Sequence, residues 1–382
     1  MQDTTSQQQG RPVTLKDIAE HCGVSKWTVA QALRGNPAVN VHTAERVRKI
    51  ASELGYRPGY NAAARRLALR KHGSDVRNHV IALFFPWYIT RSRYFADLLH
   101  GIMQGVGHAG YELLNINAEN QDPLLDTQSL ASFQRGDVDA AILYGAGAYS
   151  EIITRLREDP GFAERPITVI CAPNNDASAV TTDDQYGAYL ATKHLVQLGH
   201  RHIAHFVNSS IIKGIGVRQE LRLHGARQAL QESGLDPEMH LHLVEIPGTF
   251  YTPVSYMHTE ETKLEDAQFL ESFYQDLQSH PEITAVLAIN DLSAQRLWYS
   301  LVRRGMSIPE DISIVGFDDT DEINTPRGEN MLTSVRLPLI RLGERAVELC
   351  VERITGTLTK NHTVVLPTEL IVRQSTTSPR LR

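Results

Sequence analysis

Residues 13–35, VTLKDIAEHCGVSKWTVAQALRG, decide the fold of the N-terminal part of the chain. Apolar side chains recur at positions i, i+3, i+4 and i+7 in the first half, which is the spacing of one buried helical face. Gly23 permits a tight turn, and a second run at helical spacing follows it. The segment therefore predicts a helix, a short turn and a second helix. The predicted buried residues are Leu15, Ile18, Ala19 and Cys22 in the first helix, and Val29, Ala32 and Leu33 in the second.

Polar residues mark where these helices begin. Thr14, with Asp17 three residues later, predicts a capping box for the first helix, and Ser25 can cap the second. A third helical pattern follows, with Asn40 or Thr43 available at its start and Val47, Ile50, Ala51 and Leu54 on its buried face. We therefore expect an all-α domain over residues 13–58, preceded by a disordered tail over residues 1–12.

The outward face of the second helix favours DNA binding. Gln31 can bond an adenine edge, and Lys26 at the start of the helix can reach guanine or phosphate, as readout in the major groove requires. The alternative is a three-helix bundle with a polar surface, but an exposed Trp27 is unusual on such a surface. Short hydroxyl side chains there suit phosphate. The predicted DNA contacts of this segment are Thr14, Ser25, Lys26, Trp27, Thr28, Gln31 and Arg34.

The charge of the chain is divided unevenly. The 382 residues carry a formal net charge of −6, yet residues 1–77 hold 13 Lys and Arg against 6 Asp and Glu, and the remainder holds 25 against 38. A basic head on an acidic body indicates that only the head meets a polyanion. A solvated helical face that happens to be basic is the alternative interpretation.

The N-terminal segments resemble those of a known family. Residues 13–35, residues 36–58 (NPAVNVHTAERVRKIASELGYRP) and residues 61–67 (NAAARRL) are similar to the DNA-binding module of the lactose-repressor (LacI-type) family of bacterial transcription regulators. The resemblance implies that Lys26, Trp27 and Gln31 read the operator. This chain has Ala30-Gln31 where the family commonly has Ser-Arg, so we expect its operator to have a different base sequence but the same docking mode.

Residues 59–78 are expected to form a hinge helix and linker. Three alanines followed by Arg65, Arg66 and Leu67 make a good but short helix, which is marginal alone in water. The family resemblance implies that two such helices enter the minor groove, where Leu67 opens a base step. Gly59-Tyr60 is a two-residue insertion relative to the family, and an ordinary basic linker is the alternative. The predicted hinge contacts are Asn61, Ala64, Arg65 and Leu67.

From His79 onward, strand-like and helix-like runs alternate, as in parallel sheets with helices on both faces. Runs such as IALFF and AVLAI are continuously apolar, as buried parallel strands are. About 300 residues exceed one comfortable core, so the pattern predicts two α/β lobes. We assign residues 79–382 to an effector-binding and dimerisation domain. Lobe 1 is placed at about 79–181 and 308–338, and lobe 2 at about 182–307 and 339–382.

Ligands of parallel sheets bind beyond the carboxyl ends of the strands. The loops there hold carboxylates and amides beside aromatic rings, a combination that suits a hydroxyl-rich ligand. Taken singly, each Asp or Asn is more readily explained as a helix cap; as a convergent set they favour a ligand site. The candidate positions are Tyr94, Phe95, the glycine loop 145–147, Asp183-Asp184, Asn290-Asp291 and Asp318-Asp319.

The body also resembles the effector domain of the LacI-type family, which is similar to periplasmic sugar-binding proteins. The similar segments are GAYLATKHLVQLGHRHIAHF, RLHGARQAL, AINDLSAQ, IPEDISIVGFDD and LPTELIVRQSTTSP. The resemblance implies Arg222 and Asp291 as polar effector ligands, Tyr94 and Phe95 as an aromatic pair, and Phe250 or Tyr251 as a further ring. With the strand-end loops, the predicted effector set is Tyr94, Phe95, Gly147, Arg222, Phe250, Asp291 and Asp318.

Two features depart from that family. Arg296 stands where the family often keeps Gly; a cation there can favour an acidic sugar or a phosphate, or reach solvent, and we favour solvent. Residues 251–266, YTPVSYMHTEETKLED, have no family counterpart that we can place.

Enzyme and metal sites are not expected. Residues 145–150, GAGAYS, lack the third glycine of a dinucleotide loop, and GxSxG, HExxH and Walker motifs are absent from the sequence. His200, His202 and His205 alternate along one strand, so they cannot converge on a metal, and we expect surface histidines. Three distant cysteines indicate neither a disulfide framework nor a zinc site. We predict no catalysis, no cofactor and no metal.

The sequence thus predicts an all-α helix-turn-helix head on a two-lobed α/β body of the periplasmic-binding-protein type. We expect a homodimeric repressor that binds a palindromic operator in double-stranded DNA and responds to a small-molecule effector, most simply a sugar. No apolar run is long enough to span a membrane and no secretory signal layout is present, so a cytoplasmic location is expected. A periplasmic-type binding protein and a nucleoid-type architectural protein are the alternatives.

Overall fold

The computed structural model divides into two compact units, Met1–Asn78 and His79–Arg382, and each is described by itself. None of the helices in the described ranges combines the length and apolarity that a bilayer crossing requires. The residues described are 13–33, 36, 39–54, 77–85, 92–117, 132–133, 136–145, 150–159, 161–171, 176–208, 217–247 and 260–380.

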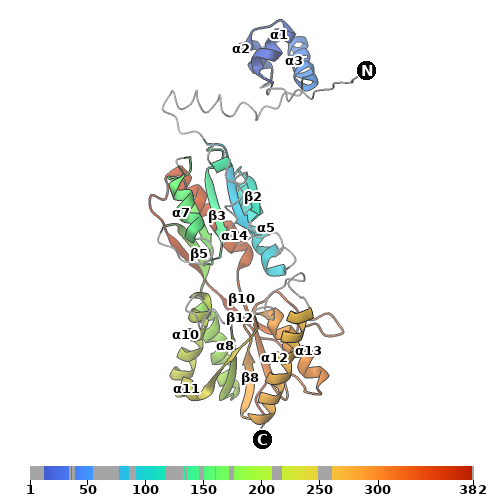
Figure 1. Ribbon diagram of the computed structural model, residues 1–382, viewed down its shortest axis with the longest axis vertical. Coiled ribbons are helices and arrows are strands. Elements are labelled where there is room, and N and C mark those ends of the chain that lie inside the picture. Colours follow the sequence, from blue (N-terminus) through green and yellow to red (C-terminus); the bar gives the residue numbers. More distant parts are fainter. Residues whose placement is uncertain are drawn as a thin grey trace, which may run out of the picture. The chain divides into compact units, whose positions relative to one another are not determined.

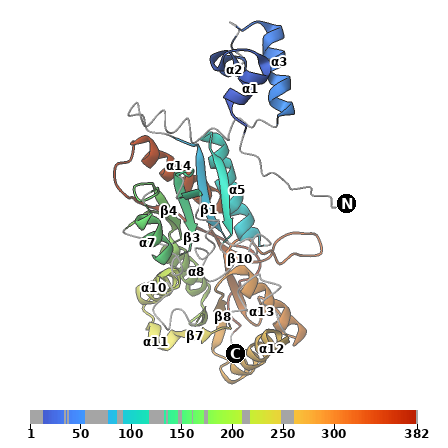
Figure 2. The ribbon, with the colours of Figure 1, turned by 45° about the horizontal axis from the view of Figure 1, so that its top comes forward.

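The first unit contains the three helices that the sequence predicted, α1 (Leu15–Cys22), α2 (Lys26–Leu33) and α3 (Val41–Glu53) (Figure 2). Ile18, Val29 and Val47 are fully buried where the helices meet. The predicted capping box is present, since the Thr14 backbone N–H donates to Asp17 at 2.7 Å and the Asp17 N–H donates to Thr14 Oγ1. Gly23 ends α1 with φ of 63°, a left-handed conformation that suits glycine.

The second unit consists of two lobes, each built on a six-stranded sheet (Figure 1). The strand order is β11-β5-β4-β3-β1-β2 in lobe 1 and β12-β10-β9-β8-β6-β7 in lobe 2. Lobe 1 contains β1 (Val80–Phe85), β2 (Glu112–Asn117), β3 (Ala140–Tyr144), β4 (Ile167–Ile170), β5 (Ser178–Thr182) and β11 (Thr363–Leu366), with α5 (Arg93–His108), α7 (Ser150–Glu158) and α14 (Leu339–Thr355). Lobe 2 contains β6 (His202–Val207), β7 (Leu241–Glu245), β8 (Ile283–Leu287), β9 (Ser313–Asp318), β10 (Thr333–Arg336) and β12 (Glu369–Ile371), with α8 (Asp184–Leu198), α10 (Val217–Glu232), α11 (Pro237–His240), α12 (Glu260–Ser279) and α13 (Asp291–Arg303).

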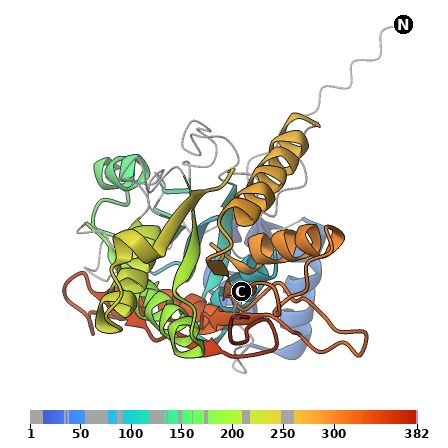
Figure 3. The same cartoon turned by 90° about the horizontal axis from the view of Figure 1, so that it is seen from below.

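Both sheets are covered by helices on both faces, as predicted. In lobe 2, Ile203 and Val315 face the core shared with α8 and α10, whereas their neighbours Ala204 and Ile314 face the core shared with α12 and α13. Figure 3 shows these two helix pairs on opposite sides of the strands. Described strand pairs are parallel except β10 with β12. Continuous apolar runs such as β8 therefore bury side chains on both faces of the sheet.

The predicted lobe boundaries were wrong in their second parts. Residues 308–338 were placed in lobe 1, but β9 and β10 pair inside the sheet of lobe 2. The sequence places residues 339–382 in lobe 2, and β12 does pair with β10 there, but α14 packs on β3, β4 and β5, and β11 pairs with β5 in lobe 1. Both lobes repeat the same strand-and-helix pattern, so periodicity alone does not show which sheet a late strand joins.

Of the three histidines expected at the surface, His200 and His205 are instead buried, whereas His202 is half-buried. His200 Nδ1 lies 2.8 Å from Thr284 Oγ1, and its Nε2 lies 2.9 Å from the carbonyl oxygen of Thr377 in the C-terminal segment. His205 lies in β6 against α10. Burial lowers the pKa of both imidazoles to about 4, so they are uncharged parts of the core at neutral pH.

Glycines allow the closest helix crossings in each lobe. A Cβ on Gly101 of α5 would overlap the carbonyl oxygen of Ile340 in α14, and one on Gly343 would overlap that of Leu98. In lobe 2, a Cβ on Gly225 of α10 would overlap the carbonyl oxygen of Gln185 in α8. These crossings bring backbones into contact, so the two helices of each pair form one rigid layer.

We expect Gly101→Ala to lower the free energy of unfolding by about 1–3 kcal/mol or more, because the new methyl group meets backbone that cannot rotate away. Gly107→Ala on the same helix is the control, since a Cβ there meets no atom within 4 Å and alanine favours a helix. Urea unfolding of the two variants checks the prediction, and an equal stability of both would contradict it.

Candidate DNA-binding and effector sites

The outward face of α2 carries the predicted DNA-contacting side chains of the head. The side chain of Trp27 is 64% exposed, although Val29 and Ala32 of the same helix are fully buried. Lys26 is also exposed, and Gln31 is half-buried. The Ser25 hydroxyl accepts the Thr28 N–H at 3.1 Å, which caps α2 as predicted. The Trp27 ring therefore lies outside the apolar core of the head.

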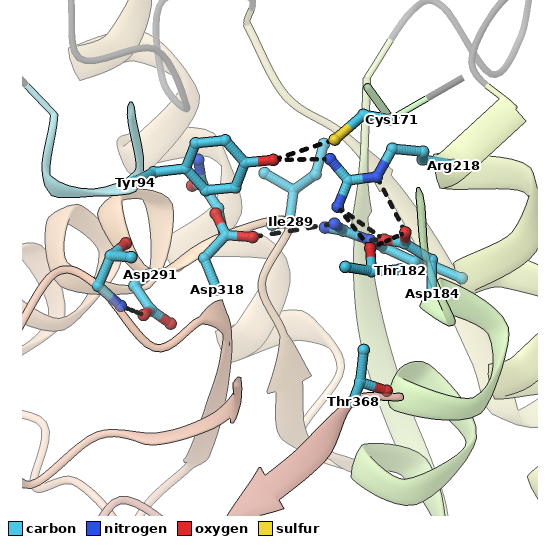
Figure 4. Close-up of polar contacts among 12 residues, drawn as sticks. Tyr94, Cys171, Thr182, Asp184, Arg218, Ile289, Asp291, Asp318 and Thr368 are labelled. Carbon is cyan, nitrogen blue, oxygen red and sulfur yellow. Dashed lines mark hydrogen bonds and ion pairs between the residues drawn. The ribbon is translucent and has the colours of Figure 1, made fainter. Parts of the chain in front are cut away.

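A second polar cluster lies at the boundary between the two lobes (Figure 4). Asp184 is the first residue of α8, directly after β5, and its side chain is fully buried. Its carboxylate accepts from Arg218 Nε at 2.9 Å and from Arg222 Nε at 2.7 Å. Although burial raises the pKa of Asp184, the two guanidinium groups lower it to about 2. One carboxylate therefore holds two arginines that lie one helical turn apart on α10.

Arg222 is fixed on every side. Its guanidinium stacks 3.5 Å from the centre of the Phe317 ring and donates to the Ile289 carbonyl at 2.6 Å. Asp318, at the end of β9, lies 3.9 Å away from its Nη2. Burial raises the pKa of Asp318 to about 7 in spite of the nearby arginines. Asp318 has φ of 103°, a left-handed conformation that costs an Asp about 1 kcal/mol or more and that collects at functional sites.

Lobe 1 contributes aromatic rings to this boundary. Tyr94, at the start of α5, is buried, and Phe95 packs edge-on against both Tyr94 and Tyr144. The Tyr94 hydroxyl accepts from Arg218 Nη1 at 3.2 Å and lies 3.5 Å from Cys171 Sγ. Figure 4 shows the Tyr94 ring, Cys171 and the Arg218 guanidinium turned toward one another. Arg218 thus joins lobe 2 to lobe 1 through a phenol that burial keeps uncharged, with its pKa well above the usual value.

Comparison with known proteins decides the family. A family model described as "Bacterial regulatory proteins, lacI family" matches residues 14–59, and one described as "Periplasmic binding protein-like domain" matches residues 192–376. The transcriptional regulator DegA of Bacillus subtilis is 28% identical over 365 residues, which cover 95% of this chain and 98% of DegA.

This chain is a LacI-family transcriptional regulator. Its fold agrees with solved structures. The cellobiose complex of the transcriptional regulator CelR has a TM-score of 0.59 at 25% identity, covering 96% of this chain and all of that chain. The lac repressor dimer bound to operator and the anti-inducer ONPF has a TM-score of 0.67 at 20% identity, with the same coverage. The relatives named here are transcriptional regulators and not enzymes.

The paired polar residues at the strand ends fall into two groups, helix caps and buried carboxylates bonded within lobe 2. Asp183 and Asn290 cap α8 and α13, accepting backbone N–H groups at 2.9 Å. The residues that follow them, Asp184 and Asp291, are buried and bonded inside the lobe. Asp291 is 1% exposed, and its two oxygens accept from the Thr320 N–H at 2.7 Å and the Ser334 hydroxyl at 2.5 Å. Asp291 therefore positions the loop that follows Asp318.

Several residues behave differently from their sequence interpretation. Arg296 does not reach free solvent, since it is 3.5 Å from Asp266 of α12. Arg218 was missed; the available signal was its position four residues before Arg222, which places both on one helical face. Cys171, Tyr144 and Thr182 were not identified as site residues from the sequence, because no charged or amide side chain lies within the strands that carry or precede them. Arg34, Asn61, Ala64, Arg65, Leu67, Gly147, Phe250 and Tyr251 lie outside the described residues.

We expect Asp318→Asn to become more stable than the parent protein as the pH rises. A carboxyl whose pKa is raised on folding stabilises the protein fully below its unfolded pKa of about 4 and loses that contribution as the pH rises toward 7. The free-energy difference between variant and parent should grow by a few kcal/mol, in order of magnitude, between about pH 5 and pH 8. Urea unfolding measures it, with Asp183→Asn as the control because Asn caps a helix as well as Asp. A difference that shrinks with rising pH would contradict the prediction.

Proposed function

We propose that this LacI-family regulator is a cytoplasmic repressor that binds a palindromic operator as a homodimer and that a small sugar-like effector at the lobe boundary controls it. The observation that carries this proposal is Arg218 of lobe 2 bonded to Tyr94 of lobe 1 beside Arg222 and Asp318. A ligand that enters this set changes contacts made by both lobes at once. It can therefore favour one lobe arrangement over another, which is what control by a ligand requires.

The DNA-binding part of the proposal is supported by α2. Trp27 projects from the side of the helix opposite Val29 and Ala32, and Lys26 is exposed at its first turn, so base edges can be reached without disturbing the core of the head. Thr14, Ser25, Thr28, Gln31 and Arg34 complete the proposed surface, and Asn61, Ala64, Arg65 and Leu67 are proposed for the minor groove.

The dimer is supported by an apolar surface on lobe 1. Met103 of α5 is 59% exposed and lies in a groove with Leu99, Val106 and Leu113, between α5 and β2. Met103 is exposed, Leu99 and Leu113 are half-buried and Val106 is buried, and an apolar groove that includes an exposed methionine suits a protein interface. The structurally similar lac repressor was solved as a dimer on its operator.

The effector is proposed to contact Tyr94, Phe95, Arg222 and Asp318, with Gly147 and Phe250 contributing from loops outside the described residues. Asp291 acts through the loop it holds. Aromatic faces beside carboxylate and guanidinium groups suit a hydroxyl-rich ring. The similar regulator CelR was solved with the sugar cellobiose.

We expect Trp27→Ala to weaken binding to the operator by about 5–100-fold, because a base-edge contact contributes about 1–3 kcal/mol of discrimination. Binding to random DNA should change less than about 3-fold, since phosphate contacts remain. The operator is first obtained by selection from random duplexes, and fluorescence anisotropy then gives both affinities. Val41→Ala, at an exposed apolar residue of α3, is the control. Equal losses on both DNAs would contradict readout by α2, and a selection without a palindrome would contradict the dimeric operator.

We expect Arg222→Gln to bind the operator normally and to lose the response to the sugar that the parent protein recognises. The effector is identified by a thermal-shift screen, since a ligand that binds the folded state raises the melting temperature. Arg227→Gln is the matched control, because Arg227 lies on the same helix and pairs with exposed Glu238. An unchanged response in Arg222→Gln would contradict the proposed site.

A further inference from the structure

Two guanidinium groups share one firmly ionised carboxylate at the lobe boundary. Arg218 and Arg222 both donate to Asp184, which is fully buried, whereas the side chain of Arg222 is 6% exposed and that of Arg218 is 19% exposed. Arg218 is therefore the member of this set that an incoming ligand meets first.

The other nearby carboxyls are less strongly ionised than Asp184, because burial raises their pKa values. Asp318 lies 3.9 Å from Arg222, beyond hydrogen-bond distance, and burial raises its pKa to about 7. Asp291 is bonded to Thr320 and Ser334, and burial raises its pKa well above the usual value. Arg218 and Arg222 thus share Asp184 as their one firmly ionised partner, and Asp321, which also acts on Asp318, interacts with Arg93 and Arg296. Two buried cations that share one carboxylate are incompletely neutralised, which favours an anion beside them.

The geometry of Arg218 shows where that anion fits. Its Nε and Nη2 donate to Asp184, and its Nη1 is turned to lobe 1, where it meets the hydroxyl of Tyr94. Burial raises the pKa of Tyr94 and of the neighbouring Cys171, so both stay uncharged. In the part of the chain that the structure describes, the outer edge of the guanidinium therefore faces neutral groups (Figure 4).

We propose, building on the proposed function, that Arg218 selects an effector with a carboxylate or phosphate group, which binds Nη1 of Arg218 beside the Tyr94 hydroxyl. The chemical class is an acidic sugar: a uronate, an aldonate or a sugar phosphate. A charge-assisted bond to guanidinium is about twice as strong as a neutral one, and it replaces water at a partly exposed cation. Arg296 does not supply this charge, because it faces Asp266.

Asp318 gives the binding a characteristic pH dependence. The charged groups that act on it are Arg222, Arg218, Asp184 and Asp321, and the buried groups that also face it are Asp291, Tyr94, Tyr144 and Cys171. An anionic ligand near Asp318 favours its protonated form, so binding takes up a proton and tightens as the pH falls from about 8 to about 6. A neutral polyol that donates hydroxyl groups to the Asp318 carboxylate has the opposite dependence.

Isothermal titration of the full-length protein tests the proposal. The probes are glucuronate, galacturonate and gluconate for the carboxylate class, glucose phosphate and ribose phosphate for the phosphate class, and glucose, galactose and ribose as neutral parents. At least one acid should bind about 10-fold or more tightly than its neutral parent, and the class that binds identifies the anion. Its affinity should rise as the pH is lowered.

Variants separate recognition of charge from a structural role. Arg218→Gln should weaken binding of the acid by about 10–100-fold and of the neutral parent by less than about 3-fold. It should fold, because Asp184 keeps its bond to Arg222. Arg218→Lys should retain the preference for the acid, and Arg227→Gln should behave as the parent protein.

The outcomes are distinct. Neutral sugars that bind as tightly as the acids, or equal losses on both in Arg218→Gln, would overturn the selection of an anion and leave the proposed function standing. If no probe binds at any pH tested, the sugar-type effector and the selectivity inferred for Arg218 fall together.

Discussion

The carboxylate of Asp184 is the group on which the lobe boundary depends. It lies at the first turn of α8, where the N-terminal end of the helix favours negative charge, and it follows β5, where the chain passes from lobe 1 to lobe 2. From there it orients both arginines of α10. Because Arg222 in turn stacks on Phe317, the position of one buried carboxylate sets the distance between α8, α10 and the end of β9.

The lobes themselves are built to resist deformation. Each has a helix pair whose backbones touch at glycines, Gly101 with Gly343 on lobe 1 and Gly225 on lobe 2. Relative motion is then confined to the three segments that connect the sheets, 182–184, 336–339 and 366–369. Tyr94 and Arg218 meet close to the first of these segments, so a contact there acts directly on the connections rather than through the cores.

Much of the fold could be predicted because its elements are long and strongly periodic. The three helices of the head and the capping box of Thr14 follow from residue type and spacing alone. The short strands β5, β10, β11 and β12 were not predicted from the sequence, since three to five residues carry little periodicity. Without these strands, the late segments 308–338 and 339–382 could not be assigned to the correct lobes, because it is the pairing of β10 and β11 that shows which sheet each segment joins.

The candidate site was predicted less completely, for a physical reason. Residue type marks Asp291 and Asp318 equally, but only packing shows that Asp291 is bonded to its own lobe while Asp318 faces Arg222. In the same way, Arg218 is one basic residue among many on a polar helix until the structure places it against Tyr94.

The order of the strands has a consequence for biosynthesis. The edge strand β11 and the helix α14 of lobe 1 follow all but one strand of lobe 2 along the chain, and Ser375 and Thr377 bond back to the middle of lobe 2. Neither lobe can therefore be completed until nearly the whole chain has left the ribosome, whereas the head emerges first and closes its own core with local contacts.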